Sequence, residues 1–181
     1  MLKRAWPAVC LIAFLSSCVK DRVTELTPVS NTDTAEHIHI NEFVATGSTL
    51  VNEFGAAADW IELYNDAGTD ITLPSKTYFL SDDPLAKGKF ALPALKIKAH
   101  DFLIVFCDDS NTVKTQVHAN FGLSKSGEAL VLNRVKAPGD TVQIDLFSYP
   151  PQTAGNSMGK IPDGKGPWKV CVPTPGQVNR Q

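Results

Sequence analysis

Asp59-Trp60-Ile61-Glu62-Leu63-Tyr64-Asn65 is the stretch that decides the fold of this 181-residue chain. Side chains alternate across a β-strand, so Ile61 and Leu63 share one face while Trp60 and its alternate neighbours share the other. This alternation predicts a half-buried strand. One face meets the core and the other is partly wet, and the heptapeptide alone leaves open which face holds Trp60.

Short apolar runs like this one recur along the chain. No segment keeps apolar residues at helical spacing over three turns, and the twelve prolines and twelve glycines fall mostly between the runs. Short strands separated by turn residues predict an all-β sandwich, one domain over residues 37–181. The expected strands are residues 37–45, 60–64, 77–80, 95–98, 102–106, 129–134, 142–149 and 168–172.

Two local patterns add detail to this prediction. Residues 102–106 are apolar on both faces, which favours a central strand that is covered on both sides. Lys136-Ala137-Pro138-Gly139-Asp140 contains the Pro-Gly pair of a turn. We therefore expect a hairpin between the strands on either side of it.

The first 17 residues have the three parts of a secretory signal. Lys3 and Arg4 are positive, residues 8–15 are apolar, and Leu15-Ser16-Ser17-Cys18 places small residues before a cysteine. The apolar run is far shorter than the roughly 20 residues that cross a bilayer as a helix. We therefore expect a cleaved signal peptide over residues 1–17.

The cysteine at the cleavage point makes this segment similar to the signals of bacterial lipoproteins. In those proteins the thiol takes a diacylglyceryl group and the freed amine takes an acyl chain such as palmitate. Several acyl chains together hold a protein stably on a membrane. The resemblance implies lipidation of Cys18 and a place in the bacterial cell envelope, at the outer membrane. An ordinary cleaved signal with an incidental cysteine is the alternative.

Residues 18–36 are rich in Thr, Ser, Asn and Asp, a composition that predicts a flexible tether. Lys20-Asp21 partly resembles the short charged signals that send some lipoproteins to the outer face of the outer membrane. The surface and the periplasmic face both stay open. Loss of Lys3 and Arg4 with the signal leaves 15 basic and 19 acidic residues, a formal charge of −4, which argues against a nucleic-acid partner.

Seven short motifs follow one another between residues 38 and 179. They are Ile40-Asn41-Glu42-Phe43, the heptapeptide at 59–65, Leu80-Ser81-Asp82-Asp83, Phe90-Ala91-Leu92-Pro93, Ala119-Asn120-Phe121-Gly122-Leu123-Ser124, Pro162-Asp163-Gly164 and Pro173-Thr174-Pro175-Gly176. In this order they resemble the lamin-tail domain. The resemblance implies an immunoglobulin-like β-sandwich, in agreement with the all-β pattern. Two local departures are Lys160, where arginine is common, and His100-Asp101, in a turn where glycine is frequent.

In this family, eukaryotic members are tails of nuclear intermediate filaments, and bacterial members are exported and thought to act as adaptor or tethering modules. The chain has no rod heptads, which excludes filament building. The resemblance implies a non-catalytic binding module, attached to the membrane through acylated Cys18, that docks an envelope protein or a glycan. An accessory subunit of a surface hydrolase or uptake complex is the alternative function.

The sequence offers no plausible catalytic constellation. Ser124, Ser126 and Ser157 lie outside any Gly-x-Ser-x-Gly elbow, and the chain contains no phosphate loop and no His-Glu-x-x-His. His118 is expected to support a turn rather than to transfer protons. We therefore expect no enzymatic activity and no cofactor.

Metal binding has two candidate sites. Asp82-Asp83 and Asp108-Asp109 are carboxylate pairs in two expected turns, and turns at one end of a sandwich can converge on calcium, which prefers oxygen ligands. Ordinary turn formation is the alternative reason for these aspartates. His37 and His39 face the same way on an expected strand and would hold zinc only if a third ligand approached.

Cys107 and Cys171 remain after signal cleavage and lipidation. In an exported protein they are candidates for a disulfide, and two separate buried thiols are the alternative.

Aromatic side chains near loops are candidates for recognising a sugar or a peptide, although aromatics in a sandwich usually belong to the core. The candidate ligand-binding residues are Trp60, Tyr64, Tyr149 and Trp168, with Tyr78 as a further aromatic.

Overall fold

The computed structural model describes residues 37–110 and 114–181, which belong to one compact unit, Thr32–Gln181. The described residues form strands and turns and contain no α-helix. The strands are β1 (Ile38–Val44), β2 (Asp59–Asn65), β3 (Ile71–Leu73), β4 (Tyr78–Ser81), β5 (Phe90–Ala91), β6 (Leu95–Ile97), β7 (Phe102–Cys107), β8 (Val117–Ala119), β9 (Glu128–Ala137), β10 (Asp140–Tyr149), β11 (Ser157–Lys160) and β12 (Trp168–Cys171). The predicted all-β class is confirmed.

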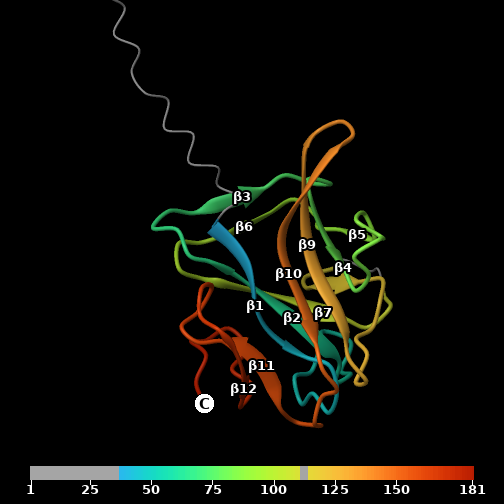
Figure 1. Ribbon diagram of the computed structural model, residues 1–181, viewed down its shortest axis with the longest axis vertical. Helices are drawn as coiled ribbons and strands as arrows, with labels where there is room; N and C mark the ends of the chain where they lie inside the picture. The colour runs from blue at the N-terminus through green and yellow to red at the C-terminus, as the bar shows by residue number, and fades with distance from the viewer. Residues whose placement is uncertain (1–36, 111–113) are drawn as a thin grey trace, which may run out of the picture. The chain divides into compact units, whose positions relative to one another are not determined.

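Three sheets make up this unit (Figure 1). The largest has six strands in the order β12-β11-β1-β2-β7-β8, the second has the order β10-β9-β4-β5, and β3 pairs with β6 alone. All pairs are antiparallel except β7 with β8. Apolar side chains from all three sheets form one core, to which β2 contributes Ile61 and Leu63 and β9 contributes Leu130 and Leu132.

The opposite face of the six-stranded sheet, called here the outer face, carries Trp60, Glu62 and Tyr64 of β2. Trp60 is nevertheless only 1% exposed, because it packs with Val44 and Phe106 in a second apolar cluster. Trp60 therefore lies on the outer face of β2, whereas Ile61 and Leu63 face the main core. The outer face is covered as well, by segments outside the strands.

A β-bulge in β1 sets which of its side chains reach the outer face. The register with β2 shifts between Ile40 and Glu42, so that Asn41 is an extra residue. One extra residue reverses the alternation, so Ile40 and Phe43, three apart, both join the core. Glu42 then pairs with Glu62 across the two strands, and Asn41 and Glu42 lie on the outer side, buried.

All eight expected strands are present. The predicted hairpin joins β9 to β10 through Pro138 and Gly139, whose φ of 83° suits the turn, and it extends beyond the rest of the unit (Figure 1). His100 has a φ of 56°, the left-handed conformation for which glycine is the usual choice, so the histidine adopts a glycine-type turn conformation here.

Four strands were not predicted: β3, β5, β8 and β11. Three of them have two or three residues. The fourth, β11, is buried throughout but reads Ser-Met-Gly-Lys, with no apolar alternation to reveal it. A Cβ at position 159 would lie 2.7 Å from the Asn179 amide nitrogen, so a larger residue there would displace this buried side chain.

Candidate functional site

Two adjoining cavities lie on the outer face of the six-stranded sheet and share Leu50 and Pro175; together they are called here the outer groove. The first, of about 480 Å³, is lined by Val44, Gly47, Ser48, Thr49, Leu50, Trp60, Gly155, Val172, Pro173 and Pro175. The second, of about 310 Å³, is lined by Leu50, Leu103, Ile104, Phe106, Thr115, Gln116, Val117, Pro175 and Gly176. Most of these side chains are apolar.

One wall of the outer groove is the segment 173–176, called here the C-terminal strap. The Gln177 N–H donates to the Thr174 carbonyl at 2.9 Å, and Gly176 has a φ of 71°. Pro175 and Gly176 therefore occupy the two central positions of a turn that favours proline first and a residue of positive φ second. The Pro-Thr-Pro-Gly sequence thus sets the shape of this wall.

Two buried carboxyl groups hold the strap on the sheet. The Thr174 backbone N–H lies 3.1 and 3.2 Å from the two carboxyl oxygens of Glu42, and its hydroxyl lies 3.0 Å from Glu42 Oε2. The Gly176 N–H donates to Glu62 Oε2 at 2.7 Å. Glu42 and Glu62 are both 0% exposed.

Burial makes both groups reluctant to ionise. Loss of solvation raises the pKa of Glu62 to about 8, against the opposing effect of its hydrogen bonds from Asn41 and Gly176. Burial also raises the pKa of Glu42, opposed by hydrogen bonds from Ser157 and Thr174. Asp163 adds a further negative charge that raises the pKa of both.

Asn41, the bulge residue, links these carboxyls to the turn after β11. Its amide Nδ2 donates to Glu62 Oε1 and to Asp163 Oδ1, both at 3.0 Å, and its Oδ1 accepts the Gly164 N–H at 2.8 Å. Asn179 closes the network, since its Nδ2 donates to the carbonyls of Asn41 and Lys160.

Four of the sequence motifs therefore meet in one buried polar network. Their residues come from 40–43, 59–65, 162–164 and 173–176. The sequence indicated these residues as markers of a fold, but it gave no sign that the two glutamates face each other, because the bulge that brings this about has no sequence signal of its own.

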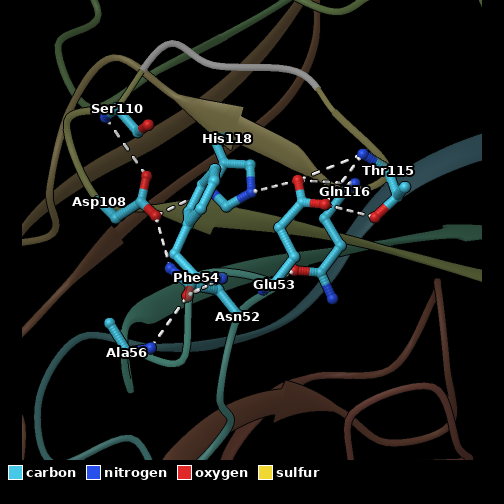
Figure 2. A network of polar contacts seen from close by, with 9 residues as sticks. All are labelled: Asn52, Glu53, Phe54, Ala56, Asp108, Ser110, Thr115, Gln116 and His118. Atoms are coloured by element: carbon cyan, nitrogen blue, oxygen red, sulfur yellow. Dashed lines mark hydrogen bonds and ion pairs between the residues drawn. The ribbon is translucent and has the colours of Figure 1, made fainter.

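Residues 48–50 line another wall of the outer groove, and their loop, residues 48–58, is fixed by a second network (Figure 2). Asn52 Nδ2 donates to Asp108 Oδ2 at 3.0 Å, and Asn52 Oδ1 accepts the backbone N–H groups of Phe54 and Ala56. The Glu53 carboxylate accepts hydrogen bonds from the Thr115 hydroxyl and backbone. These bonds, the Thr115 hydroxyl first, lower the pKa of Glu53.

His118 lies at the centre of this second network (Figure 2). Its Nδ1 is 2.8 Å from Asp108 Oδ2 and its Nε2 is 3.3 Å from Glu53 Oε1, with the rings of Phe54 and Phe106 5.0 and 5.5 Å away. The ring is 0% exposed, so a substrate cannot reach it. The Asp-His pair therefore acts as a structural link between the wall and strands β7 and β8.

The serines considered for catalysis lie elsewhere. The Ser124 carbonyl is 3.1 Å from the Tyr149 hydroxyl, and its backbone N–H donates to Glu128. The Ser126 N–H donates to the Ser124 hydroxyl. Ser157 is buried in β11, with its hydroxyl 3.4 Å from the Cys171 carbonyl. Within residues 37–110 and 114–181, none of these three hydroxyl groups forms a hydrogen bond with a histidine.

The four aromatic candidates do not form one exposed patch. Trp60 lines the outer groove from beneath, and Tyr64 packs on Phe102 at 4.8 Å further along the same face. Tyr149 and Trp168 contact Phe43 in the main core, at 4.5 and 5.7 Å. Tyr78, the further aromatic, is also buried in that core.

The four candidate calcium ligands are occupied by neighbouring groups or exposed. Asp82 forms an ion pair with Lys89, and the Asp83 carboxylate accepts the Leu85 N–H. Asp108 binds Asn52 and His118, and Asp109 is exposed with a φ of 56°. Within residues 37–110 and 114–181, no group of three or more histidine, cysteine, aspartate or glutamate side chains is placed to hold a metal ion.

His37 and His39 do share a third group, which is Asp66. Its carboxylate lies 2.6 Å from His37 Nδ1 and 3.2 Å from His39 Nε2, but Lys165 Nζ is also 2.7 Å away. Burial raises the pKa of Asp66, yet its hydrogen bonds from Lys165 and His37 outweigh that effect and lower it. The cluster is an ion-pair network with its own cation.

The possible disulfide between Cys107 and Cys171 is not formed, and both residues are free, buried thiols. Cys107 is in β7 and Cys171 in β12, with β11, β1 and β2 between them. Four inter-strand steps of about 4.8 Å place them about 19 Å apart. A disulfide needs Cα atoms within about 7 Å, so the disulfide prediction is wrong and the alternative of two separate thiols holds.

The predicted signal, the lipidation site Cys18 and the tether lie outside the described residues. In the part of the chain that the structure does describe, no helix has the length and apolar character needed to cross a membrane. No family model and no curated protein matches the chain.

Proposed function

We propose that this protein is a non-catalytic, lipid-anchored binding module of the bacterial cell envelope. In this proposal Cys18 carries the acyl chains, residues 18–36 act as a tether, and residues 37–181 form an immunoglobulin-like sandwich of the lamin-tail type. The ordered motifs and the all-β sheets support the type of domain. The lipoprotein-like segment ending at Cys18 supports the location at the outer membrane.

The observation that carries the binding role is the outer groove. It is an apolar recess whose two walls are fixed by polar networks, and a rigid recess loses little conformational freedom when a partner enters it. Val172, at 61% exposure, lies at the rim of the first cavity and extends the apolar surface outward.

A protein partner fits the groove better than a glycan. Sugar recognition commonly uses the exposed flat face of an aromatic ring, and the aromatic candidates here pack their rings against other side chains. The groove instead presents aliphatic side chains and prolines. We therefore propose that an apolar segment of an envelope protein enters the groove.

The experiment is affinity capture from intact cells with the full-length chain and two variants. Leu50→Glu places a charge in both cavities, whereas Leu85→Glu places the same charge at a residue that is 92% exposed and outside the groove. We expect wild type and Leu85→Glu to recover one stoichiometric partner and Leu50→Glu to lose it. Recovery of the same partner by all three proteins would reject the groove as the binding site.

A further inference from the structure

The C-terminal strap crosses the middle of the outer face, and buried carboxyl groups of the sheet hold it there. Thr174 contacts Glu42 through its N–H and its hydroxyl, and Gly176 contacts Glu62 through its N–H. Under the strap lie the apolar side chains of the groove floor, including Trp60, Ile104 and Phe106. The attachment of this wall thus depends on two titratable side chains.

The hydrogen-bond geometry around Thr174 favours a proton on Glu42. The Thr174 hydroxyl lies 3.0 Å from Glu42 Oε2 and 3.0 Å from Asn179 Oδ1. Asn179 Oδ1 is an acceptor, because Nδ2 of the same amide donates to two backbone carbonyls at 3.1 and 3.0 Å. A hydroxyl has one proton to donate. The two contacts are separate, full hydrogen bonds when Glu42 is a neutral acid that donates to the hydroxyl, which then donates to Asn179.

The charges around Glu42 and Glu62 also favour a bound proton. Glu42 of β1 and Glu62 of β2 face each other. The other acidic group near both of them is Asp163, in the turn after β11. Within the described residues none of these three carboxyls forms an ion pair with a lysine, arginine or histidine. The nearest cationic side chain on β11, Lys160, binds Asp145 instead.

The remaining neighbours bring no compensating positive charge. From β11, the Ser157 hydroxyl forms a hydrogen bond with Glu42. From β12 comes the Cys171 thiol, whose pKa is raised first by burial and also by the charge of Glu42. On the β7 side, Ile104 is the residue opposite Glu62. An unpaired buried carboxylate is costly, so ionisation of this pair favours any conformation that returns it to water.

We propose that the C-terminal strap is a pH-sensitive latch, in which a proton held by the Glu42 and Glu62 pair keeps residues 173–176 on the sheet and loss of that proton releases them. Release hydrates the two carboxylates and uncovers Trp60, Ile104 and Phe106. The pKa of Glu62, raised by burial to about 8, places the transition in the neutral to mildly alkaline range. This inference concerns the fold itself and holds whether or not the groove binds a partner.

The test is hydrogen exchange of the Thr174 and Gly176 amides between pH 5 and pH 9, corrected for the intrinsic pH dependence of exchange. The full-length chain is used, purified in detergent, with core amides of β1 and β2 as internal references. If Glu62 has an ordinary pKa of 4.5 when the strap is open and about 8 when it is closed, protection of the strap falls about tenfold per pH unit up to about pH 8. Above that pH it becomes constant.

Glu62→Gln and Glu42→Gln each remove one ionisation, and together they should abolish the slope. Asp140→Asn removes an exposed carboxylate at the hairpin and should keep it. Three outcomes overturn the proposal: constant protection of the wild-type strap, a slope that survives in the double variant, or equal loss of protection in β1 and β2, which would mean global unfolding.

A second measurement covers the case in which the variants do not fold. Carbon-13 NMR of wild-type protein reads the ionisation of the Glu42 and Glu62 carboxyls directly. We expect at least one of them to be neutral at pH 7. Two carboxylates fully charged at pH 6, with the strap protected, would also overturn the latch.

Discussion

Glu62→Gln should remove most of the pH dependence of stability near neutrality. A pKa raised from 4.5 to about 8 on folding means that the native state holds a proton that the unfolded state has lost. The stability from this proton is complete below pH 4.5 and is lost as pH rises through about 8. At 1.36 kcal/mol per pKa unit the whole effect is about 5 kcal/mol.

The most useful window runs from pH 6.5 to pH 8. The pKa of Asp59, raised by burial and by Glu128 to about 6, and the burial-lowered pKa of His39 have their main effects below this window. Across it, Glu62 alone should reduce the free energy of unfolding by about 2 kcal/mol. The raised pKa of Glu42 acts in the same direction.

The assay is urea unfolding followed by tryptophan fluorescence at several pH values. Wild type and Asp140→Asn should lose stability toward pH 8, and Glu62→Gln should lose about 2 kcal/mol less across the window, keeping only the part that comes from Glu42. A wild-type protein whose stability is constant or rises over this window would refute the reasoning. The same slope in Glu62→Gln and Glu42→Gln would refute it too, because neither buried carboxyl would then be its source.

Three further predictions follow from other parts of the chain. Asn65→Ala should lower the free energy of unfolding by about 3 kcal/mol, measured by urea denaturation. The fully buried Asn65 amide donates hydrogen bonds to the carbonyls of Ile97 and Lys98 and accepts one from the Ala67 N–H, and the variant leaves these groups unpaired. A loss below about 1 kcal/mol would contradict this prediction. Titration of the protein denatured without reductant should find Cys107 and Cys171 both reactive toward a thiol reagent, and a disulfide there would contradict the strand order. Cys18→Ser should move the protein from the membrane fraction to the soluble fraction and abolish labelling by an alkyne fatty acid, whereas unchanged labelling would place the acyl chains elsewhere.

The part of the fold that follows from local sequence was predictable. Ile61 and Leu63 alternate with polar or aromatic neighbours, and this pattern gave β2 to within one residue at each end. Pro138 and Gly139 gave the position of the β9–β10 hairpin for the same reason, because a turn depends on a few adjacent residues.

The parts that depend on pairing between distant strands were not predictable. The bulge at Asn41 appears in the register of β1 with β2 and leaves no mark in the composition of either strand. Strand β11 is held by its neighbours β1 and β12 rather than by apolar alternation. The cysteine pairing failed for a similar reason, since the three strands that separate β7 from β12 follow from topology alone.

In the candidate site, too, single residues were predictable from local sequence, but their arrangement depends on segments that are distant in the chain. Trp60 was identified from its place in the heptapeptide, but its position beneath the groove depends on the loop at 48–58 and on the strap. Glu42 and Glu62 belong to two of the sequence motifs, but neither motif indicates a role for its carboxyl group. The role of these two carboxyl groups follows from their contacts with the strap at 173–176, which only the fold brings next to them.

The measurement that tests the central claim most directly is site-specific photocrosslinking in intact cells. A photoreactive amino acid is placed at Thr49 or Val172, two exposed residues of the groove, or at Leu85 as the exposed control. We expect one protein adduct of the same mass from Thr49 and Val172 and none from Leu85. No adduct at the groove positions, or an identical adduct at all three, would contradict it.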